Sequence, residues 1–426
     1  MEELHNETLQ ERAVLVGLNA DCFTKEQTAT DQTLEELEAL LETAGGFCTG
    51  KILQNRHAPD AHSFIGEGKA IEVKMLVEAT ASTMVVFDNE LSPGNIRALE
   101  EIIGVTVLDR SALILDIFAQ RAKTREGRLQ VELAQYKYLL PRLSGMGKSL
   151  SRQGGGIGTR GPGETQLESD RRHIRERISR LQTELEQVRQ VRGVQRQRRM
   201  KNSVPVVAIV GYTNAGKSTL LNRLTDAGIP ANNRLFDTLD TTSRLLTVSD
   251  TLDVVISDTV GFIRKLPHQL VEAFKATLEE LEYADLLVHV VDVSNPGWQQ
   301  QAQVVEDLIV ELGASELPRI TVYNKVDALP AGEILPRGED CCAISARTGQ
   351  GVEELLRQID RRLDKGTRRV TLHLPYDQGG MLDMLYREAK VEQVDYSQTI
   401  DITAVCSPRV LGRVAPYLEQ PAEGEA

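Results

Sequence analysis

Residues 206–219 read VVAIVGYTNAGKST, an apolar run followed directly by the pattern GxxxxGKS. The apolar run predicts a buried strand, and the leucines at 220, 221 and 224 predict that a helix follows. A glycine-rich loop between a strand and a helix turns backbone N–H groups toward phosphate oxygens, and the helix N-terminus adds a favourable potential for anions. In this pattern the lysine reaches the β- and γ-phosphates, and the next hydroxyl binds Mg2+. We therefore predict a phosphate-binding loop formed by Gly211, Tyr212, Thr213, Asn214, Ala215, Gly216, Lys217, Ser218 and Thr219.

A second motif lies 40 residues after Ser218, at the end of the next apolar run. The strand predicted over 254–258 ends in Asp258, Thr259, Val260 and Gly261. A carboxylate here holds Mg2+ through water, and a glycine N–H contacts the γ-phosphate. Hydrolysis removes that contact, so the motif predicts a switch.

The residue after this motif is Phe262, where many proteins of this fold carry a glutamine that orients the attacking water. A phenyl ring cannot orient water. We therefore predict a low intrinsic hydrolysis rate that a large partner raises.

A third motif predicts which base the site accepts. The strand predicted over 320–324 ends in Asn324 and Lys325, and Asp327 follows. A carboxylate here accepts hydrogen bonds from N1–H and the 2-amino group of guanine, whereas adenine offers neither donor. Asn324 and Lys325 are expected to brace the loop and cover the base. Backbone contacts to the guanine oxygen are expected from Ser345, Ala346 and Arg347. Three motifs in this order, each at the carboxyl end of a parallel strand, predict a GTP-binding domain.

A loop that senses the γ-phosphate is expected between the first two motifs, and residues 236–242 (FDTLDTT) are the candidate. A threonine in such a loop completes the Mg2+ shell when the γ-phosphate is present. Three threonines compete for this role, at 238, 241 and 242, and spacing alone does not choose among them.

Charge is distributed unevenly along the chain. The 426 residues hold 49 Lys+Arg against 62 Asp+Glu, a net of −13, and such an average argues against nucleic-acid binding. Residues 137–201 alone hold 16 Lys+Arg against 6 Asp+Glu, a net of +10, which leaves −23 elsewhere. Leucines and other apolar residues spaced four and three apart, over 129–143 and 174–188, predict two helices. A loop over 144–163 with eight glycines joins them. Such a hairpin suits structured RNA, and a solvated helical face is the alternative.

Other features exclude several classes of protein. No run approaches the 18 apolar residues of a transmembrane helix, and the first ten residues lack the basic and apolar regions of a signal peptide. The five cysteines form no CxxC pair, which disfavours a zinc site or a disulfide framework. We expect a cytoplasmic monomer with reduced thiols.

The order of apolar runs predicts an α/β protein of four domains. We expect a small α/β domain over 1–112, a basic helical hairpin with a glycine-rich loop over 113–202, a P-loop GTPase domain with a parallel sheet over 203–366, and a small α+β domain over 367–426. Strands are expected in the first domain at 13–18, 84–87 and 105–108. In the third they are expected at 206–210, 254–258, 286–292, 320–324 and 342–345.

Several further motifs resemble those of HflX-type GTPases, a family of ribosome-associated proteins. They are GGGIGTRGPGETQLE at 154–168 with DRR at 170–172, FIGEGK at 64–69, DR at 109–110, ILDIFAQR at 114–121, GYTNAGKST at 211–219, FDTLD at 236–240 and DTVGFI at 258–263. The resemblance covers about residues 13–365.

The resemblance implies a cytoplasmic GTPase that binds the large ribosomal subunit and its RNA through residues 113–202 and splits or rescues stalled ribosomes under stress. GTP occupancy is expected to favour binding and hydrolysis to permit release. The resemblance assigns the Mg2+ threonine to Thr238. It places GTP contacts on Phe236, Asp237, Thr238, Leu239 and Asp240.

The same resemblance completes the expected chemistry. The catalytic residues would be Lys217, Thr238 and Gly261, and the Mg2+ ligands Ser218, Thr238 and Asp258. Asn214 resembles GTPases that also use a monovalent cation, which suggests K+. Thr241 stands where family members usually have proline, so this switch is expected to be looser.

Three other functions compete with this interpretation. A ribosome-assembly GTPase would share every nucleotide motif, although the 154–168 signature favours ribosome splitting. A passive RNA-binding adaptor would not need intact Lys217, Ser218, Thr238 and Asp258. An ATPase or RNA helicase is disfavoured by Asp327.

Overall fold

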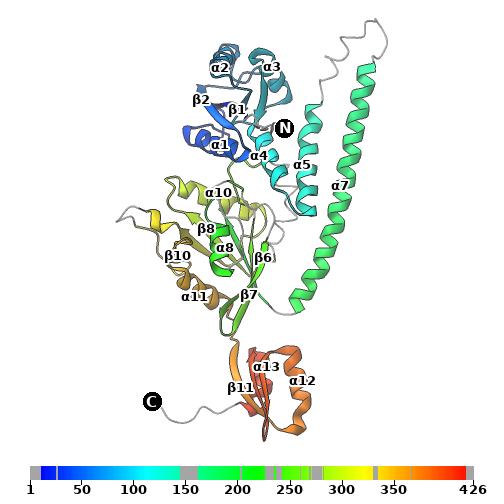
Figure 1. Ribbon diagram of the computed structural model, residues 1–426, viewed down its shortest axis with the longest axis vertical. Coiled ribbons are helices and arrows are strands. Elements are labelled where there is room, and N and C mark those ends of the chain that lie inside the picture. Colours follow the sequence, from blue (N-terminus) through cyan, green and yellow to red (C-terminus); the bar gives the residue numbers. More distant parts are fainter. Residues whose placement is uncertain are drawn as a thin grey trace, which may run out of the picture.

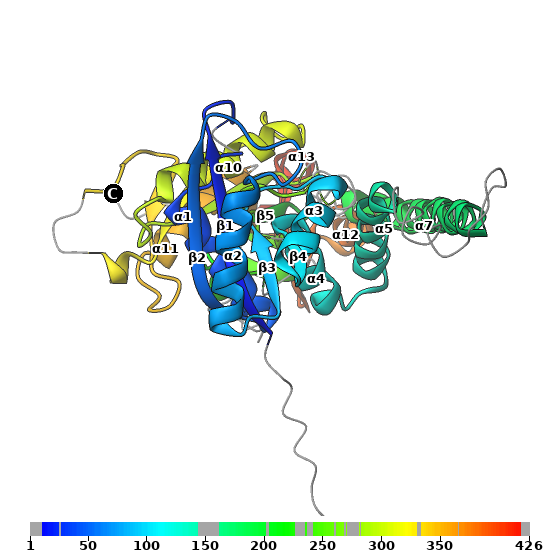
Figure 2. The same ribbon diagram turned by 90° about the horizontal axis from the view of Figure 1, so that it is seen from above.

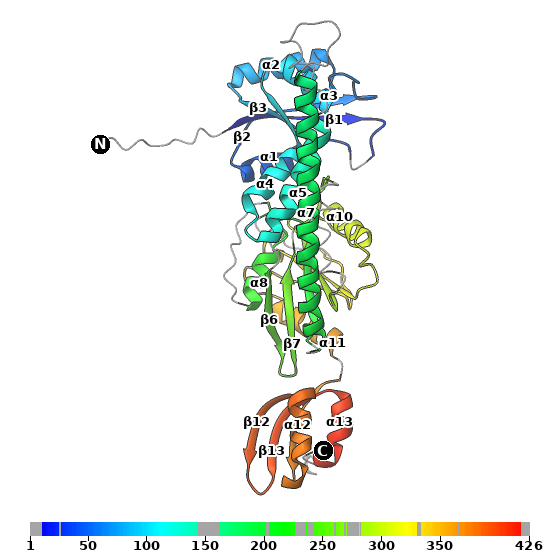
Figure 3. The ribbon, with the colours of Figure 1, turned by 90° about the vertical axis from the view of Figure 1, so that its right-hand side faces the viewer.

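The computed structural model describes residues 11–24, 27–143, 162–201, 204–225, 235–236, 242–259, 261–267, 270, 281, 283–329, 334–364 and 366–418. Along its longest axis an N-terminal domain, a central domain and a C-terminal domain follow one another. A pair of helices runs beside the first two (Figures 1 and 3). The fold class is the predicted α/β arrangement around a P-loop domain.

The N-terminal domain is a four-stranded parallel sheet in the order β2-β1-β3-β4, with helices on both faces. Its strands are β1 (Arg12–Ala20), β2 (Phe47–Arg56), β3 (Met84–Phe87) and β4 (Thr106–Asp109), and its helices are α1 (Asp31–Ala44), α2 (Glu67–Thr80) and α3 (Pro93–Ile103). The three predicted strands are present. β2 and α2 are elements that the sequence pattern does not predict.

The side chains of this sheet supply two cores. One face packs with α2 and α3 around Val14, Phe87 and Leu99. The other face carries Leu15 and Val86 and shares one continuous cluster with Leu37 of α1, with α4 and with the central domain. The N-terminal domain is therefore seated on the central domain through buried apolar contacts (Figure 1).

A connecting helix leads from the N-terminal domain into a long helical pair. It is α4 (Arg110–Arg121), and the predicted domain boundary at 112/113 falls within it. In the pair, α5 (Arg125–Arg142) packs against α7 (Pro162–Lys201). The contact is formed by residues of the two predicted apolar stripes: Leu129, Leu133, Tyr136, Ile178, Leu181 and Leu185. Figure 2 shows this pair projecting to one side of the N-terminal sheet. The predicted glycine-rich tip falls mostly outside the described residues.

The central domain has a six-stranded sheet in the order β10-β9-β8-β5-β7-β6. Its strands are β5 (Val206–Gly211), β6 (Thr242–Ser249), β7 (Leu252–Asp258), β8 (Leu286–Asp292), β9 (Arg319–Asn324) and β10 (Cys341–Ala343). The described helices are α8 (Lys217–Thr225), α10 (Trp298–Glu311), the 3-10 turn η1 (Val326–Ala328) and α11 (Val352–Leu363). All five predicted strands are present and mutually parallel. β6 is a sixth strand, antiparallel to β7, that the sequence pattern does not predict.

The C-terminal domain is a three-stranded antiparallel sheet in the order β11-β13-β12, from β11 (Arg368–Leu374), β12 (Lys390–Tyr396) and β13 (Ile400–Cys406). It is covered by α12 (Gly379–Glu388) and α13 (Pro408–Val414), with the 3-10 turns η2 (Tyr376–Gln378) and η3 (Ala415–Tyr417). Its separate core includes Leu372, Leu385 and Ile402. Among the described residues, no helix is both long and apolar enough to cross a membrane.

Candidate functional site

The phosphate-binding loop connects β5 to α8, as predicted, and its backbone needs glycine at two points. Gly211 has φ +157° and Gly216 has φ +95°, both in the region that disfavours side chains. A Cβ on Gly211 would collide with the Val290 carbonyl of β8, and one on Gly216 with the Asn324 amide of β9. The loop therefore fits between two neighbouring strands only because these residues lack side chains.

Lys217 is the first residue of α8 and is buried. Its Nζ donates hydrogen bonds to the Gly211 carbonyl at 3.1 Å and the Tyr212 carbonyl at 2.9 Å, which holds it across the loop. Burial lowers the pKa of Lys217 to about 8, opposed by the nearby Asp258 carboxylate. A phosphate in the loop would supply the negative charge that this desolvated ammonium lacks.

Ser218 and Asp258 meet at the edge of this loop. The Ser218 Oγ donates to the Asp258 Oδ2 at 2.8 Å, and the carboxylate is buried at the end of β7. A hydroxyl and a carboxylate are the hard oxygen donors that Mg2+ takes alongside phosphate oxygens and water. These two residues therefore fit a magnesium ion, with Asp258 positioned by its strand and Ser218 by the helix.

The second motif packs directly against the phosphate-binding loop. The Thr213 N–H donates to the Phe262 carbonyl at 2.6 Å, and the Phe262 N–H donates to the Gly211 carbonyl at 3.1 Å. A Cβ on Gly261 would lie 2.9 Å from the Thr213 Cα and 3.0 Å from the Lys217 Nζ. Gly261 is thus brought to the phosphate end of the site. Thr259 donates to the Ile209 carbonyl at 2.7 Å, and Val260 lies outside the described residues.

Of the predicted γ-phosphate loop, residues 236–242, the structure describes the first residue, Phe236, and the last, Thr242. The Phe236 N–H donates to the Thr213 hydroxyl at 2.9 Å, and Phe236 has φ +56°, a left-handed conformation. Its buried ring lies 4.7 Å from the Phe118 ring of α4, measured between centroids. Asp237, Thr238, Leu239, Asp240 and Thr241 lie outside the described residues, and Thr242 begins β6. The Phe118 contact is one that the motifs did not predict, because it comes from a different domain.

The predicted base-recognition residues meet at the carboxyl ends of β9 and β10. Asn324 donates from Nδ2 to the Ala215 carbonyl at 2.8 Å and accepts from the Ala346 N–H at 2.9 Å, so it ties the phosphate-binding loop to the loop after β10. Lys325, with φ +68°, forms an ion pair with Asp292 at 2.6 Å. Asn324 therefore connects two loops of the site, and Lys325 is held at its edge by Asp292.

Asp327 lies beside this brace, with its carboxylate contacted by Arg347. A hydrogen bond from the Ser345 side chain, together with the Arg347 charge, lowers the pKa of Asp327, so it is anionic at neutral pH. Arg223 of α8 donates to the carbonyls of Ala346 and Arg347 and holds their loop in place. Arg223 is a supporting residue that no motif indicated.

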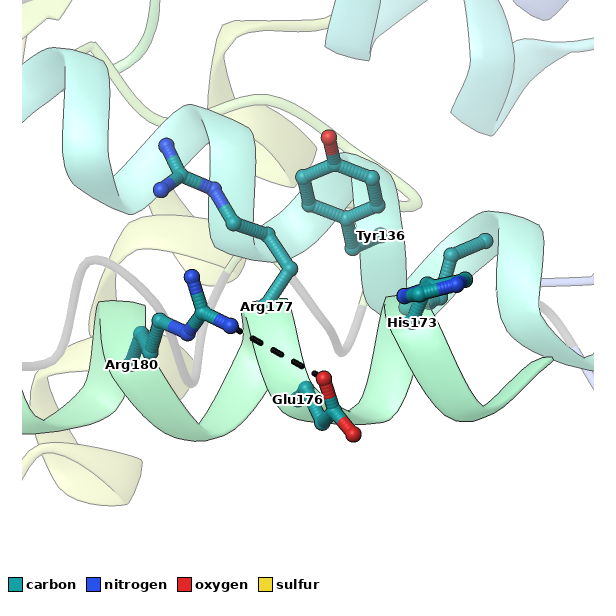
Figure 4. Close-up of a pocket in the computed structure, with 6 residues that line it drawn as sticks. Tyr136, His173, Glu176, Arg177 and Arg180 are labelled. Carbon is teal, nitrogen blue, oxygen red and sulfur yellow. Dashed lines mark ion pairs between the residues drawn. The ribbon is translucent and has the colours of Figure 1, made fainter. Parts of the chain in front are cut away.

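A shallow cavity of about 280 Å3 lies on the helical pair, between α5 and α7 (Figure 4). Its lining residues are Tyr136, His173, Ile174, Glu176, Arg177 and Arg180. Two of these arginines already have carboxylate partners, since Arg177 pairs with Glu132 at 2.7 Å and Arg180 with Glu176 at 3.8 Å. Arg172 and Arg175, in contrast, are exposed on α7 and have no ion pair among the described contacts.

Comparison with known proteins matches family models to most of this chain. Family models match in chain order: GTP-binding GTPase N-terminal over residues 31–119, GTP-binding GTPase Middle Region over 121–199, 50S ribosome-binding GTPase over 206–325, and HflX C-terminal domain over 335–404. The last match extends the family resemblance beyond residue 365.

Similar proteins agree with these matches. The chain is 50% identical over 399 residues to GTPase HflX of Caldanaerobacter subterraneus subsp. tengcongensis, covering 93% of this chain and 91% of that protein. It is 46% identical over 388 residues to GTPase HflX of Escherichia coli (strain K12), covering 90% of each. A solved structure of a GTP-binding protein from the archaeon Sulfolobus solfataricus in complex with GDP matches at 24% identity with a TM-score of 0.44, covering 83% of this chain and 99% of that one.

Proposed function

Because the chain belongs to the HflX family of GTPases, we propose that it binds the large ribosomal subunit and splits or rescues stalled ribosomes under stress, with GTP binding and hydrolysis driving the cycle. The observation that carries this proposal is a nucleotide site with its phosphate, magnesium and base elements assembled beside a strongly basic helical pair. The description of the matched central model as a 50S ribosome-binding GTPase supports the choice of partner.

Each part of the nucleotide site receives a role in this proposal. Lys217 and the Gly261 N–H stabilise the transferring γ-phosphoryl group, and Thr238 is the third catalytic residue. Mg2+ supplies the charge that neutralises the phosphates, held by Ser218, Thr238 and Asp258. Asn214 of the phosphate-binding loop is the residue that would hold K+. Equal hydrolysis rates in K+ and Na+ would exclude this role.

The identity of residue 262 supports the proposal that the ribosome stimulates hydrolysis. Phe262 is buried and its backbone is bonded to Gly211, so its ring is part of the core and not of the water site. The intrinsic rate is low for that reason, and ribosome binding raises it by ordering the site. The four units 1–112, 113–202, 203–366 and 367–426 act together in a cytoplasmic monomer.

Sucrose-gradient sedimentation of 70S ribosomes tests the proposal. The protein with a non-hydrolysable GTP analogue is expected to convert 70S particles into subunits and to migrate with the large subunit, whereas GDP is expected to do neither. Intact 70S particles with protein bound only to free large subunits would instead indicate an assembly GTPase. Absence of any ribosome association would contradict the proposal.

Reversing charge on the helical pair is expected to remove this association. The Arg172→Glu/Arg175→Glu variant replaces two exposed cations of α7, and each lost phosphate contact reduces both the affinity and its salt dependence. We expect ribosome binding about 10-fold weaker or more at 100 mM salt, measured by co-sedimentation. Intrinsic GTP hydrolysis should be unchanged.

The control for this test is Arg357→Glu/Arg361→Glu, which makes the same change on the exposed face of α11. Equal loss of binding in both variants would mean that net charge and not the helical pair decides the association.

A further inference from the structure

A buried polar cluster joins the N-terminal domain to the residues that follow the DTVG motif. Arg264 and Lys265 lie three and four residues beyond Gly261. The Lys265 Nζ donates to the Asp88 Oδ2 at 2.5 Å, which crosses from the central domain to the end of β3. Lys265 has φ +54°, a strained conformation for a residue with a side chain, so this contact holds it in place.

On the N-terminal side, Arg110 organises the cluster. It donates to Asp88 at 2.9 Å and to Glu36 of α1 at 2.5 Å, and Thr33 also donates to Asp88 at 2.8 Å. Arg110 and Asp88 are buried, and Glu36 and Lys265 are nearly so. The four charges balance only while Lys265 is present, because Arg110 alone faces two carboxylates.

Tyr212 links the same cluster to the phosphate-binding loop. Its hydroxyl donates to Glu36 and accepts the Arg264 N–H at 2.9 Å. Burial and the adjacent Glu36 carboxylate raise the pKa of Tyr212 well above its ordinary value, so this hydroxyl keeps its proton. The backbone carbonyl of the same residue accepts from Lys217 at 2.9 Å. One residue thus contacts the N-terminal domain, the segment after DTVG and the phosphate-binding lysine.

The chain between Gly261 and this cluster is short and anchored. Phe262 pairs with Tyr212 in a β-bridge, and Phe262 and Ile263 are buried. Only Phe262 and Ile263 separate Gly261 from Arg264. A movement of Gly261 toward or away from a γ-phosphate would therefore also displace Arg264 and Lys265. The Phe118–Phe236 ring contact crosses the same interface from the γ-phosphate loop.

We propose that Glu36, Asp88 and Arg110 are positioning residues. Through Tyr212 and Lys265 they couple the presence of the γ-phosphate to the strength of the contact between the N-terminal and the central domain. The inference rests on the proposed GTP cycle and adds the route between the two domains. Coupling of this kind is reciprocal. If the γ-phosphate changes the stability of the contact between the two domains, weakening that contact changes the ratio of the GTP and GDP affinities by the same factor.

The test uses Glu36→Gln, Lys265→Met and the double variant in the full chain. Affinities for GDP and a non-hydrolysable GTP analogue are measured by displacement of a fluorescent nucleotide. Each single variant is expected to change the ratio of the two affinities by about fivefold or more. The double variant should add little further, because both changes break one interface. Lys265→Arg should restore most of the wild-type ratio.

A matched control lies on the same helix. Glu38 pairs with Lys51 at 2.5 Å entirely within the N-terminal domain, so Glu38→Gln and Lys51→Met remove an equivalent ion pair without touching the interface. Hydrogen exchange of α1 and α4 provides a second measurement, expected to differ between the two nucleotides in the wild type and not in the variants.

The outcomes separate two failures. A wild type that binds neither nucleotide would contradict the proposed function. A wild type that binds and hydrolyses GTP, with variants that keep its affinity ratio within twofold or controls that shift the ratio equally, would overturn the coupling alone.

Discussion

Replacing Lys217 with alanine is expected to weaken GTP binding by about 10- to 100-fold and to slow hydrolysis of bound GTP by about 100- to 1,000-fold. Its ammonium lies inside the phosphate-binding loop, held by the Gly211 and Tyr212 carbonyls. A charged donor in a dry site loses little to solvent, so its interaction with the transferring phosphoryl group is strong. Single-turnover hydrolysis at saturating GTP separates the two effects.

The expected loss does not come from unfolding. Burial disfavours the charged form of Lys217, as the lowering of its pKa to about 8 indicates, so the folded chain gains little stability from this ammonium. Thermal unfolding of the Lys217→Ala variant should therefore resemble that of the wild type. Lys69→Ala is the control, since Lys69 pairs with Glu72 on α2, away from the site. Hydrolysis by Lys217→Ala at the wild-type rate would refute the catalytic role.

Most of the nucleotide site could be predicted because its signals are local. The phosphate-binding loop, the DTVG motif and the NKxD motif each lie within a few consecutive residues after an apolar run. Parallel strands then bring their carboxyl ends to one edge of the sheet. The heptad-like stripes of the helical pair were predictable for the same reason, since a regular spacing marks one helix face.

The unpredicted strands lack such a signal. β2 (FCTGKILQNR) mixes polar and apolar residues and contains Gly50, and as an edge strand only one of its sides is paired. β6 is also an edge strand, in the central sheet, and it runs antiparallel to its neighbour β7. Its residues include the exposed Leu245. A strand that is buried on one face only, or that lies at the edge of a sheet, needs fewer apolar residues. A search for apolar runs therefore misses it.

The cluster between the domains could not be predicted at all. Lys265 and Asp88 are 177 residues apart, and Tyr212 and Glu36 are 176 apart. Glu36 is one of several acidic residues of α1, and the other three lie outside the helices and strands. Nothing in the local pattern distinguishes a charge that meets a partner in another domain from a charge that faces water. Only the packing of α1 and β3 against the central domain brings them together.

Replacing Asp327 with asparagine is expected to reverse the base preference of the site. Guanine offers two donors to this carboxylate, and an amide can accept from one while its own NH2 faces the other. A hydrogen bond to a charged group contributes about 1.5–3 kcal/mol and a neutral one about 1 kcal/mol. Losing one charged bond and weakening the other therefore corresponds to GTP binding about 100- to 1,000-fold weaker. Xanthosine triphosphate has a carbonyl in place of the 2-amino group, which the new NH2 can donate to.

The structure makes this reversal a specific test because Asp327 is held independently of the base. The Ser345 hydrogen bond and the Arg347 charge lower the pKa of Asp327, so the carboxylate is ionised before a base binds. An amide in its place does not require other residues of the site to move. Competition binding with GTP and xanthosine triphosphate measures the switch, and Asp307→Asn on α10 controls for loss of a carboxylate in the same domain. In the proposed cycle ribosome association depends on the γ-phosphate and not on the base, so the variant loaded with xanthosine triphosphate should still associate with ribosomes. Unchanged GTP affinity would refute base recognition by Asp327, whereas binding of xanthosine triphosphate without ribosome association would place the error in the proposed partner.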